Sequence, residues 1–210
     1  YGHFEGVSSV RACVEASVET GVKYLSLFAF SEENWNRPGS EVSTLMGLMV
    51  KAMADEMESL DKNGVRFVVL GNRERLDTAL NETIDACMEK TKYNKTLTLI
   101  IFLSYSGKWD ILQAAKKLVL ELKDDPECSA KLDSITISDF DKYLITSDIP
   151  DPDLIIRTSG EHRLSNYLLW QGAYSEFYFT ETLWPDFRKD QFREALNSYA
   201  KRDRRYGKVK

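Results

Sequence analysis

Five short apolar runs, each bordered by a longer segment with helical periodicity, limit what this chain can fold into. The clearest run is 24–30, which is apolar on both faces and is followed by the polar stretch 31–38. Strands that alternate with helices of about ten or more residues need crossover connections, which give a mostly parallel sheet with helices on both faces. The sequence therefore predicts an α/β fold. The other predicted strands are 65–70, 97–103, 154–156 and 176–180.

The segments between these runs carry apolar residues at intervals of three and four, as one buried helical face requires. In 6–20 the spaced residues are valines, and Gly21 is placed to end the helix. The segment 41–62 has a wide apolar face rich in methionine, with Ser40 as its expected cap. Further helices are predicted at 74–90, from the turn 104–107 to about 123, at 137–146 opening at Ser138 or Asp139, at 166–173 and at 188–202.

Composition narrows the class of protein. The chain has 210 residues, 43% of them hydrophobic and 29% charged, which is ordinary for a globular protein and predicts a single domain over 1–210. A net charge of −5 argues against broad nucleic-acid binding, and no run approaches the roughly 20 apolar residues of a membrane span. Cys13, Cys87 and Cys128 are odd in number and widely spaced, so we expect no disulfide framework and a reducing, cytoplasmic compartment.

Two polar loops follow predicted strands, and parallel strands would bring both to the same edge of the sheet. The first contains Ser31, Glu32, Glu33, Asn34, Trp35 and Arg37, and the second contains Arg157, Glu161, His162, Arg163 and Ser165. Arginine forks match phosphate oxygens, and carboxylates beside them suggest a Mg²⁺ ion bridging carboxylate and phosphate. Glycine-rich phosphate loops of the Walker or dinucleotide type are absent from the sequence. The residues by themselves predict an α/β enzyme that acts on a phosphorylated small molecule.

Each feature has a simpler interpretation that the sequence leaves open. The loop arginines could form solvated ion pairs with neighbours such as Glu161. Trp35 could anchor its loop, and the methionine-rich face of 41–60 could belong to the core alone.

Several ordered motifs together identify a family. The longest are Phe30-Ser-Glu-Glu-Asn-Trp-Asn-Arg-Pro38 and Asp153-Leu-Ile-Ile-Arg-Thr-Ser-Gly-Glu-His-Arg-Leu-Ser-Asn166. Shorter ones include Gly2-His3-x-x-Gly6, Tyr105-x-Gly-Lys-Trp-Asp110 and Leu183-Trp-Pro-Asp-Phe187. With these motifs the chain resembles the cis-prenyltransferases almost from end to end, most closely the bacterial undecaprenyl diphosphate synthases.

The resemblance implies a reaction and roles for individual residues. In that family, isopentenyl diphosphate units are added with Mg²⁺ to an allylic diphosphate, usually farnesyl diphosphate. The products are long polyprenyl diphosphates such as undecaprenyl diphosphate, the lipid carrier for cell-wall synthesis. The matching positions are Arg157, Arg163, Leu164 and Ser165 for isopentenyl diphosphate; His3, Ser31, Glu32, Glu33, Trp35 and Arg37 for the other substrate contacts; Asn34 for the proton-abstraction step; and Glu176, with His162 as a further candidate, for the metal.

The resemblance also implies a tunnel for the growing apolar tail. It would lie between the sheet and two helices, which here favours Ala29, the 41–60 helix with Met49 and Met53, and the strand 97–103. A flexible thioether suits a wall that must accommodate a lengthening chain.

The most serious departure from the family pattern lies before Tyr1. The family's Asp-Gly-Asn loop, whose Asp is the principal Mg²⁺ ligand and the residue most associated with catalysis, would precede Gly2-His3. It is expected upstream of Tyr1, and no residues here match it. We therefore expect the first strand of the fold to be missing, the domain 1–210 to be incomplete at its N-terminus, and this chain alone to be inactive.

Smaller departures fall within the recognised motifs. Ser104 and Ser106 stand where many relatives have Asn and Gly, and Ser159 stands where Gly is common. We expect these changes not to alter the chemistry.

The resemblance further implies a homodimer, with 161–180 and the C-terminal segment near the subunit contact. It implies a cytoplasmic enzyme that associates peripherally with the inner face of the membrane. A non-catalytic partner subunit of a heteromeric prenyltransferase is the main alternative. Such subunits typically lose both polar loops, and both are present here.

Overall fold

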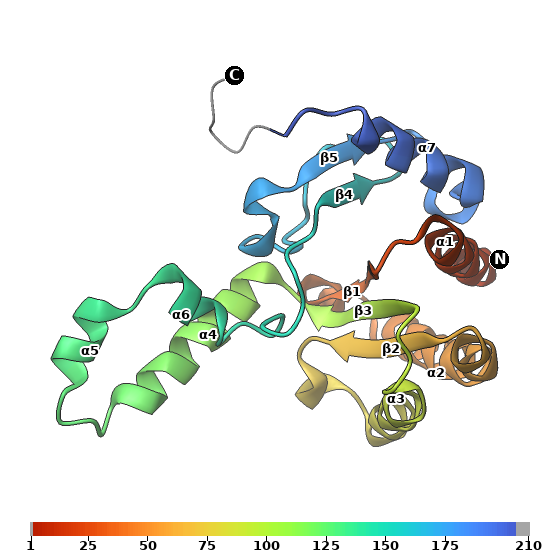
Figure 1. Cartoon of the computed structure of the whole chain (residues 1–210). Helices are drawn as coiled ribbons and strands as arrows, with labels where there is room; N and C mark the ends of the chain where they lie inside the picture. The colour runs from red at the N-terminus through yellow and green to blue at the C-terminus, as the bar shows by residue number, and fades with distance from the viewer. Residues whose placement is uncertain (1, 205–210) are drawn as a thin grey trace.

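The computed structural model describes the backbone of residues 2–204 and the side chains of residues 6–204 (Figure 1). Its strands form two parallel sheets. β1 (Tyr24–Ser31), β3 (Leu97–Tyr105) and β2 (Val65–Leu70) lie side by side in that order, and β4 (Leu154–Arg157) pairs with β5 (Glu176–Phe179). The predicted strands are all present and every pairing is parallel, so the predicted α/β class is confirmed.

Helices connect these strands and cover them. The described elements are α1 (Gly2–Thr20), α2 (Gly39–Lys62), α3 (Thr78–Thr91), α4 (Gly107–Leu122), α5 (Cys128–Ser134), α6 (Ile137–Asp141) and α7 (Lys189–Ala200), with short 3-10 turns η1 (Glu32–Asn36), η2 (Arg73–Arg75), η3 (Gln171–Tyr174) and η4 (Trp184–Asp186).

The helices differ from the predicted ones in several places. The helix expected at 166–173 does not form, because Ser165, Asn166 and Leu168 adopt positive φ and only the turn η3 follows them. The helix expected at 137–146 is the shorter α6, which opens at Thr136 through a hydroxyl that accepts from the Asp139 amide at 3.2 Å. In the region expected to be loose, the sequence reading missed α5. The helix α2 begins one residue before its expected cap, Ser40.

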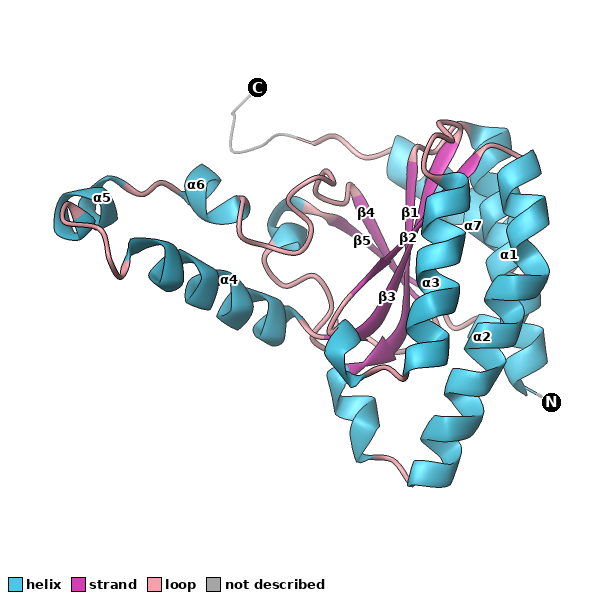
Figure 2. Ribbon diagram, turned by 90° about the horizontal axis from the view of Figure 1, so that it is seen from below, coloured by secondary structure: helices cyan, strands magenta, loops and turns pink. Residues whose placement is uncertain are grey.

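The central strand β3 separates two clusters of buried side chains. On one face, Leu99 and Ile101 pack with side chains of α1, α2 and α3. On the other face, Ile100 and Phe102 pack against the irregular segments around Ile149 and Leu168. Strand β3 has eight of its nine residues buried, as expected for a continuous apolar run in the middle of a parallel sheet. The arm formed by α4, α5 and α6 extends away from both clusters (Figure 2).

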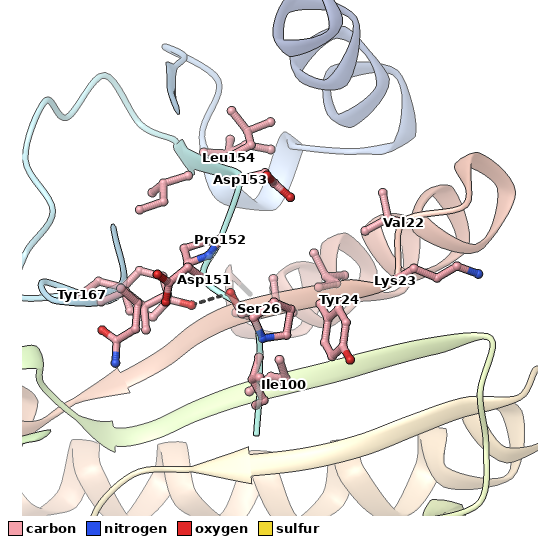
Figure 3. A pocket seen from close by; sticks show the side chains of 18 of the residues that line it. Val22, Lys23, Tyr24, Ser26, Ile100, Asp151, Pro152, Asp153, Leu154 and Tyr167 are labelled. Carbon is pink, nitrogen blue, oxygen red and sulfur yellow. Dashed lines mark hydrogen bonds between the residues drawn. The ribbon is translucent and has the colours of Figure 1, made fainter. Parts of the chain in front are cut away.

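The two sheets turn unpaired edges toward each other. Strand β1 is at the edge of the larger sheet and β4 belongs to the smaller one. Cavities of about 420 and 570 Å³ lie between them, each lined by residues of both strands. Figure 3 shows the smaller cavity, with Pro152 and Leu154 on one side and Ile100 on the other. A hydrogen bond of 2.8 Å from the Tyr167 hydroxyl to Ser26 Oγ crosses this space.

Directly after β2, Gly71 lies against the backbone of β3, where a larger residue would not fit. Gly71 has a φ of +143°, and a Cβ there would lie 1.8 Å from the Leu103 carbonyl oxygen. We expect Gly71→Ala to lower the free energy of unfolding by about 3 kcal/mol, because backbone must move on both strands. Gly47→Ala is the matched control, since nothing lies within 4 Å of its Cβ position and alanine favours the helix by about 1 kcal/mol. Urea unfolding measures both, and equal midpoints for the two variants would contradict this account.

Candidate functional site

The first polar loop is a single turn held by its own side chains. Strand β1 ends at Ser31, whose amide donates to Asn34 Oδ1 at 3.0 Å, so Asn34 closes the turn η1. Further along, Arg37 pairs with Glu41 at 2.9 Å in the first turn of α2. Arg37 thus forms an exposed ion pair with a residue four positions further along the chain.

Trp35 anchors this loop. Its indole Nε1 donates to Ser104 Oγ at 2.8 Å, and its ring meets Phe30 edge-on at 5.2 Å between centroids. The same serine hydroxyl donates to Glu32 Oε1 at 2.6 Å, and Arg75 binds Glu32 Oε2 at 2.8 Å. Neither Ser104 nor Arg75 could be recognised as a site residue from the sequence, because Ser104 lies near the end of β3, Arg75 follows β2, and no local pattern joins them to the loop.

The second polar loop begins where β4 ends, at Arg157. Its backbone is tied to the segment after β5 by the amides of Ser159 and Gly160, which donate to Thr182 and Thr180 carbonyl oxygens at 2.9 Å. Arg163 pairs with Glu161, as the ion-pair interpretation expected, and remains exposed. Ser165, also exposed, has a φ of +50°.

The two loops touch each other as predicted, although the strands that they follow, β1 and β4, belong to two sheets and not to one. Asn166 Nδ2 donates to Glu33 Oε1 at 2.7 Å, while Asn166 Oδ1 accepts from the Lys108 amide at 3.0 Å. Partial burial by itself would raise the pKa of Glu33, but the hydrogen bonds from Asn166, its own backbone and Ser31, with the nearby Lys108 charge, lower that pKa overall. Asn166 therefore connects both loops and the start of α4. The sequence analysis quoted it in a motif without giving it a role.

A cavity of about 570 Å³ lies beside the second loop, with Arg157 and Arg163 in its wall. A second cavity of about 490 Å³ lies between α1, α2 and the larger sheet, and its wall includes Met49 and Met53. The two cavities share wall residues and therefore adjoin: Val7, Val10, Ala29, Met49, Ala52 and Ile101. The larger cavity is cationic at one end, and the second is mainly apolar in the region where the sequence led us to expect a tunnel.

The described residues do not form a metal site by themselves. Glu176 lies at the start of β5 and accepts from Arg202 at 2.8 Å, whereas Arg157 lies opposite the far end of that strand. The His162 ring packs on Phe179 at 4.9 Å between centroids. In the described part of the chain no three His, Cys, Asp or Glu side chains gather as metal ligands would.

Two expectations about the N-terminus fall outside what the structure describes. The resemblance placed the family's catalytic Asp upstream of Tyr1, and Tyr1 itself lies outside the described residues. His3 lies in α1, but its side chain is not among the described ones. The structure therefore does not test either expectation, and both stay predictions.

Fold and site together define an α/β protein with a cationic pocket that opens toward an apolar cavity. The family model described as "Putative undecaprenyl diphosphate synthase" matches residues 1–207. The chain belongs to this prenyltransferase family, whose members are transferases.

Relatives in sequence and structure agree with this assignment. The chain is 47% identical to an isoprenyl transferase of Chlorobaculum tepidum over 210 residues, 99% of this chain and 77% of the relative. It is 44% identical to the "Ditrans,polycis-undecaprenyl-diphosphate synthase ((2E,6E)-farnesyl-diphosphate specific)" of Photorhabdus laumondii, over 99% of this chain and 80% of the relative.

Two solved structures are similar along almost the whole chain. One is lavandulyl diphosphate synthase from Lavandula x intermedia in complex with dimethylallyl diphosphate, with a TM-score of 0.91, 32% identity, and 98% and 88% of the two chains covered. The other is a probable undecaprenyl diphosphate synthase from Campylobacter jejuni, with a TM-score of 0.83, 34% identity, and 97% and 92% covered. Among the helices of the described residues, none has the length and apolar character needed to cross a membrane.

The contact between the loops can be measured through the pKa of Glu33. We expect Asn166→Gly to raise that pKa toward the ordinary glutamate value, because the variant removes the hydrogen bond while permitting the native φ of +64°. A lowered folded pKa means that the contact stabilises the protein above the unfolded pKa and is lost as pH falls through the folded pKa. Carbon-detected NMR titration measures the pKa of Glu33. Asn36→Gly is the control, because Asn36 lies in the same turn as Glu33. An unchanged Glu33 pKa in Asn166→Gly would show that the contact does not form in solution.

Proposed function

We propose that this chain is a cis-prenyltransferase that adds isopentenyl diphosphate units to farnesyl diphosphate. The product would be a long polyprenyl diphosphate such as undecaprenyl diphosphate, the lipid carrier of cell-wall synthesis. The observation that carries the proposal is the adjoining pair of cavities, one with arginines in its wall and the other mainly apolar. Such a pair suits a molecule with a diphosphate head and a hydrocarbon tail. The name of the Photorhabdus relative supports farnesyl diphosphate as the allylic substrate.

In this proposal the second loop holds the diphosphate of isopentenyl diphosphate. Arg157 and Arg163 supply forked donors that match phosphate oxygens. Ser165 adds a hydroxyl, and Leu164 lines the same cavity as the arginines. Arg163 would exchange its exposed partner Glu161 for the ligand, which is a small change because exposed ion pairs contribute only about 0–1 kcal/mol.

The first loop would face the allylic substrate and the reacting atoms. The substrate contacts in this proposal are His3, Ser31, Glu32, Glu33, Trp35 and Arg37. Breaking the allylic carbon–oxygen bond builds negative charge on the departing diphosphate, and cationic groups near it lower the barrier. The alkene of isopentenyl diphosphate then attacks the allylic carbon, and a proton leaves.

Asn34 would orient this step, since a carboxamide is a poor base and its oxygen already accepts from Ser31. We infer that a diphosphate oxygen takes the proton. Asn34→Ala should therefore lower the single-turnover condensation rate without abolishing substrate binding. The measurement is rapid-quench kinetics with both substrates saturating, and an unchanged rate would remove Asn34 from the mechanism.

Mg²⁺ stays part of the proposal through the substrate. Without a diphosphate the described residues do not fit a metal, because Glu176 is paired with Arg202 and no three of their His, Cys, Asp or Glu side chains gather as ligands would. Mg²⁺ keeps most of its shell as phosphate oxygens and water, so it would arrive with a diphosphate, with Glu176 and His162 as candidate contacts.

We also propose one domain over 1–210 that acts as a homodimer, cytoplasmic and peripherally bound at the inner face of the membrane. A single domain is supported by contacts between the first and last helices, where Lys189 lies 2.6 Å from Glu15 and 2.9 Å from Glu19. The subunit contact is supported by Tyr174 and Phe179, whose surfaces are 75% and 41% exposed on the segment 161–180.

The direct test is transfer of labelled isopentenyl diphosphate by the full-length protein in the presence of farnesyl diphosphate and Mg²⁺. Long butanol-extractable products are expected, and Arg157→Met should weaken isopentenyl diphosphate binding about 10-fold or more through loss of a charge-assisted contact. Arg193→Met on α7, outside both cavities, is the control. Absence of any condensed product would refute the proposed function.

The adjoining cavities make a second prediction about tail length. Ala52 lines both cavities, so Ala52→Phe should obstruct the passage and shorten the products. Ala54→Phe, exposed on the same helix, should leave product length unchanged. Chromatography of the dephosphorylated products reports the result, and identical lengths in both variants would place the tail elsewhere.

A further inference from the structure

We propose that Ser104 and Arg75 are positioning residues that hold the turn η1 in the shape required for prenyl transfer. They act through Glu32 and Trp35, and the four side chains together form a support for the turn. The inference rests on the proposed function, although its structural half can be tested without any substrate.

Ser104 binds two residues of the turn with one hydroxyl. It is fully buried at the end of β3. Its oxygen accepts from Trp35 Nε1 at 2.8 Å while its proton goes to Glu32 Oε1 at 2.6 Å. A hydroxyl has one proton to donate and two lone pairs, so both contacts can exist together. This hydroxyl thus fixes the two side chains relative to each other.

Arg75 completes the support from the other side. Its Nη1 lies 2.8 Å from Glu32 Oε2, and its guanidinium carbon lies 4.7 Å from the centre of the Trp35 ring. Both carboxylate oxygens of Glu32 therefore have protein partners. Trp35 is held by its N–H edge and by one face. These contacts hold both side chains in place in the free protein.

The support connects the carboxyl ends of three strands. Glu32 and Trp35 follow β1, Arg75 follows β2, and Ser104 lies on β3. The ends of β2 and β3 are themselves joined, because the Asn72 amide donates to the Ser104 carbonyl oxygen at 2.8 Å. Side chains fixed in this way to regular elements hold a site more accurately than a free loop does.

The residues that this support positions are Glu33 and Asn34, which lie between the two held side chains. Glu33 reaches Asn166 of the second loop, and Asn34 closes the turn. A shift of the turn would therefore move the proposed orienting amide while leaving Arg157 and Arg163 in place. Since a misplacement of about 1 Å in a catalytic group can lower a rate about 100-fold, the expected loss is in kcat.

The test uses variants chosen to separate the hydroxyl from the backbone. Ser104 has a φ of +53°, so Ser104→Gly removes the hydroxyl without strain, and Ser104→Asn restores a donor and an acceptor in a residue that tolerates this φ. Arg75→Met removes the second contact. Arg73→Met is its matched control, because Arg73 lies on the same turn but pairs with Asp85 at 2.8 Å.

Two measurements are made on each variant. The first is the NMR signal and solvent exchange of the Trp35 indole N–H in the free protein. The second is kcat and KM for isopentenyl diphosphate. We expect Ser104→Gly and Arg75→Met to shift the indole signal and to lower kcat about 10-fold or more, with KM changed by less than about twofold. Ser104→Asn and Arg73→Met should stay close to the parent protein.

Each outcome decides the proposal. A parental kcat in both Ser104→Gly and Arg75→Met, or an equal loss in Arg73→Met, would overturn it. If Ser104→Gly fails to fold, the exposed Arg75→Met carries the test. If the parent protein transfers no prenyl group, the proposed function fails, and the indole signal alone decides whether Ser104 and Arg75 hold the turn.

Discussion

The parallel pairing of β3 with β1 and β2 is the interaction on which the rest of the molecule depends. Because all three strands run in the same direction, the segments that leave them emerge at one edge. Residues far apart in sequence, such as Trp35 and Ser104, can therefore share a hydrogen bond there. The pairing is stabilised by burial of β3 on both faces, where each apolar side chain contributes about 1.5–3 kcal/mol. The polar groups at the strand ends add little stability by comparison, and their placement follows from the apolar pairing beneath them.

The acidic side chains of the first loop and the arginines of the second loop differ in how firmly they are paired within the protein. The acidic side chains of the first loop already have partners within the protein: Glu32 contacts Ser104 and Arg75, and Glu33 contacts Asn166. The arginine side chains of the second loop are less committed, and Arg163 has only an exposed partner in Glu161. A diphosphate would then meet cations that lose little on binding, beside carboxylates that already have hydrogen-bond or ion-pair partners within the protein. This arrangement reconciles many acidic residues with an anionic ligand.

Much of this structure could be predicted from the sequence, and the failures have physical causes. The strands were identifiable because apolar runs with β-branched residues fit a parallel sheet, and the likeness of two polar loops to one family led to the correct family. The helix at 166–173 was expected from its apolar composition. It does not form because Ser165, Asn166 and Leu168 adopt positive φ, which composition does not reveal. The division of the strands into two sheets depends on which strand edges pair with each other, and the residues of a single strand do not determine its partner. The contacts of Ser104 and Arg75 were missed for the same reason, since three strand ends must be assembled before they exist.

The methionines that line the apolar cavity have a consequence for how such a protein ages. Met49 lies on the wall common to both cavities, and Met53 lies deeper, against the core. Oxidation of a thioether to a sulfoxide places a strongly polar, chiral group in a wall that is mainly apolar. At Met49 such a change would put a polar oxygen where the two cavities adjoin. Oxidation by peroxide would then change the polarity of the cavity wall at Met49, and repair by sulfoxide reductases would restore the apolar wall.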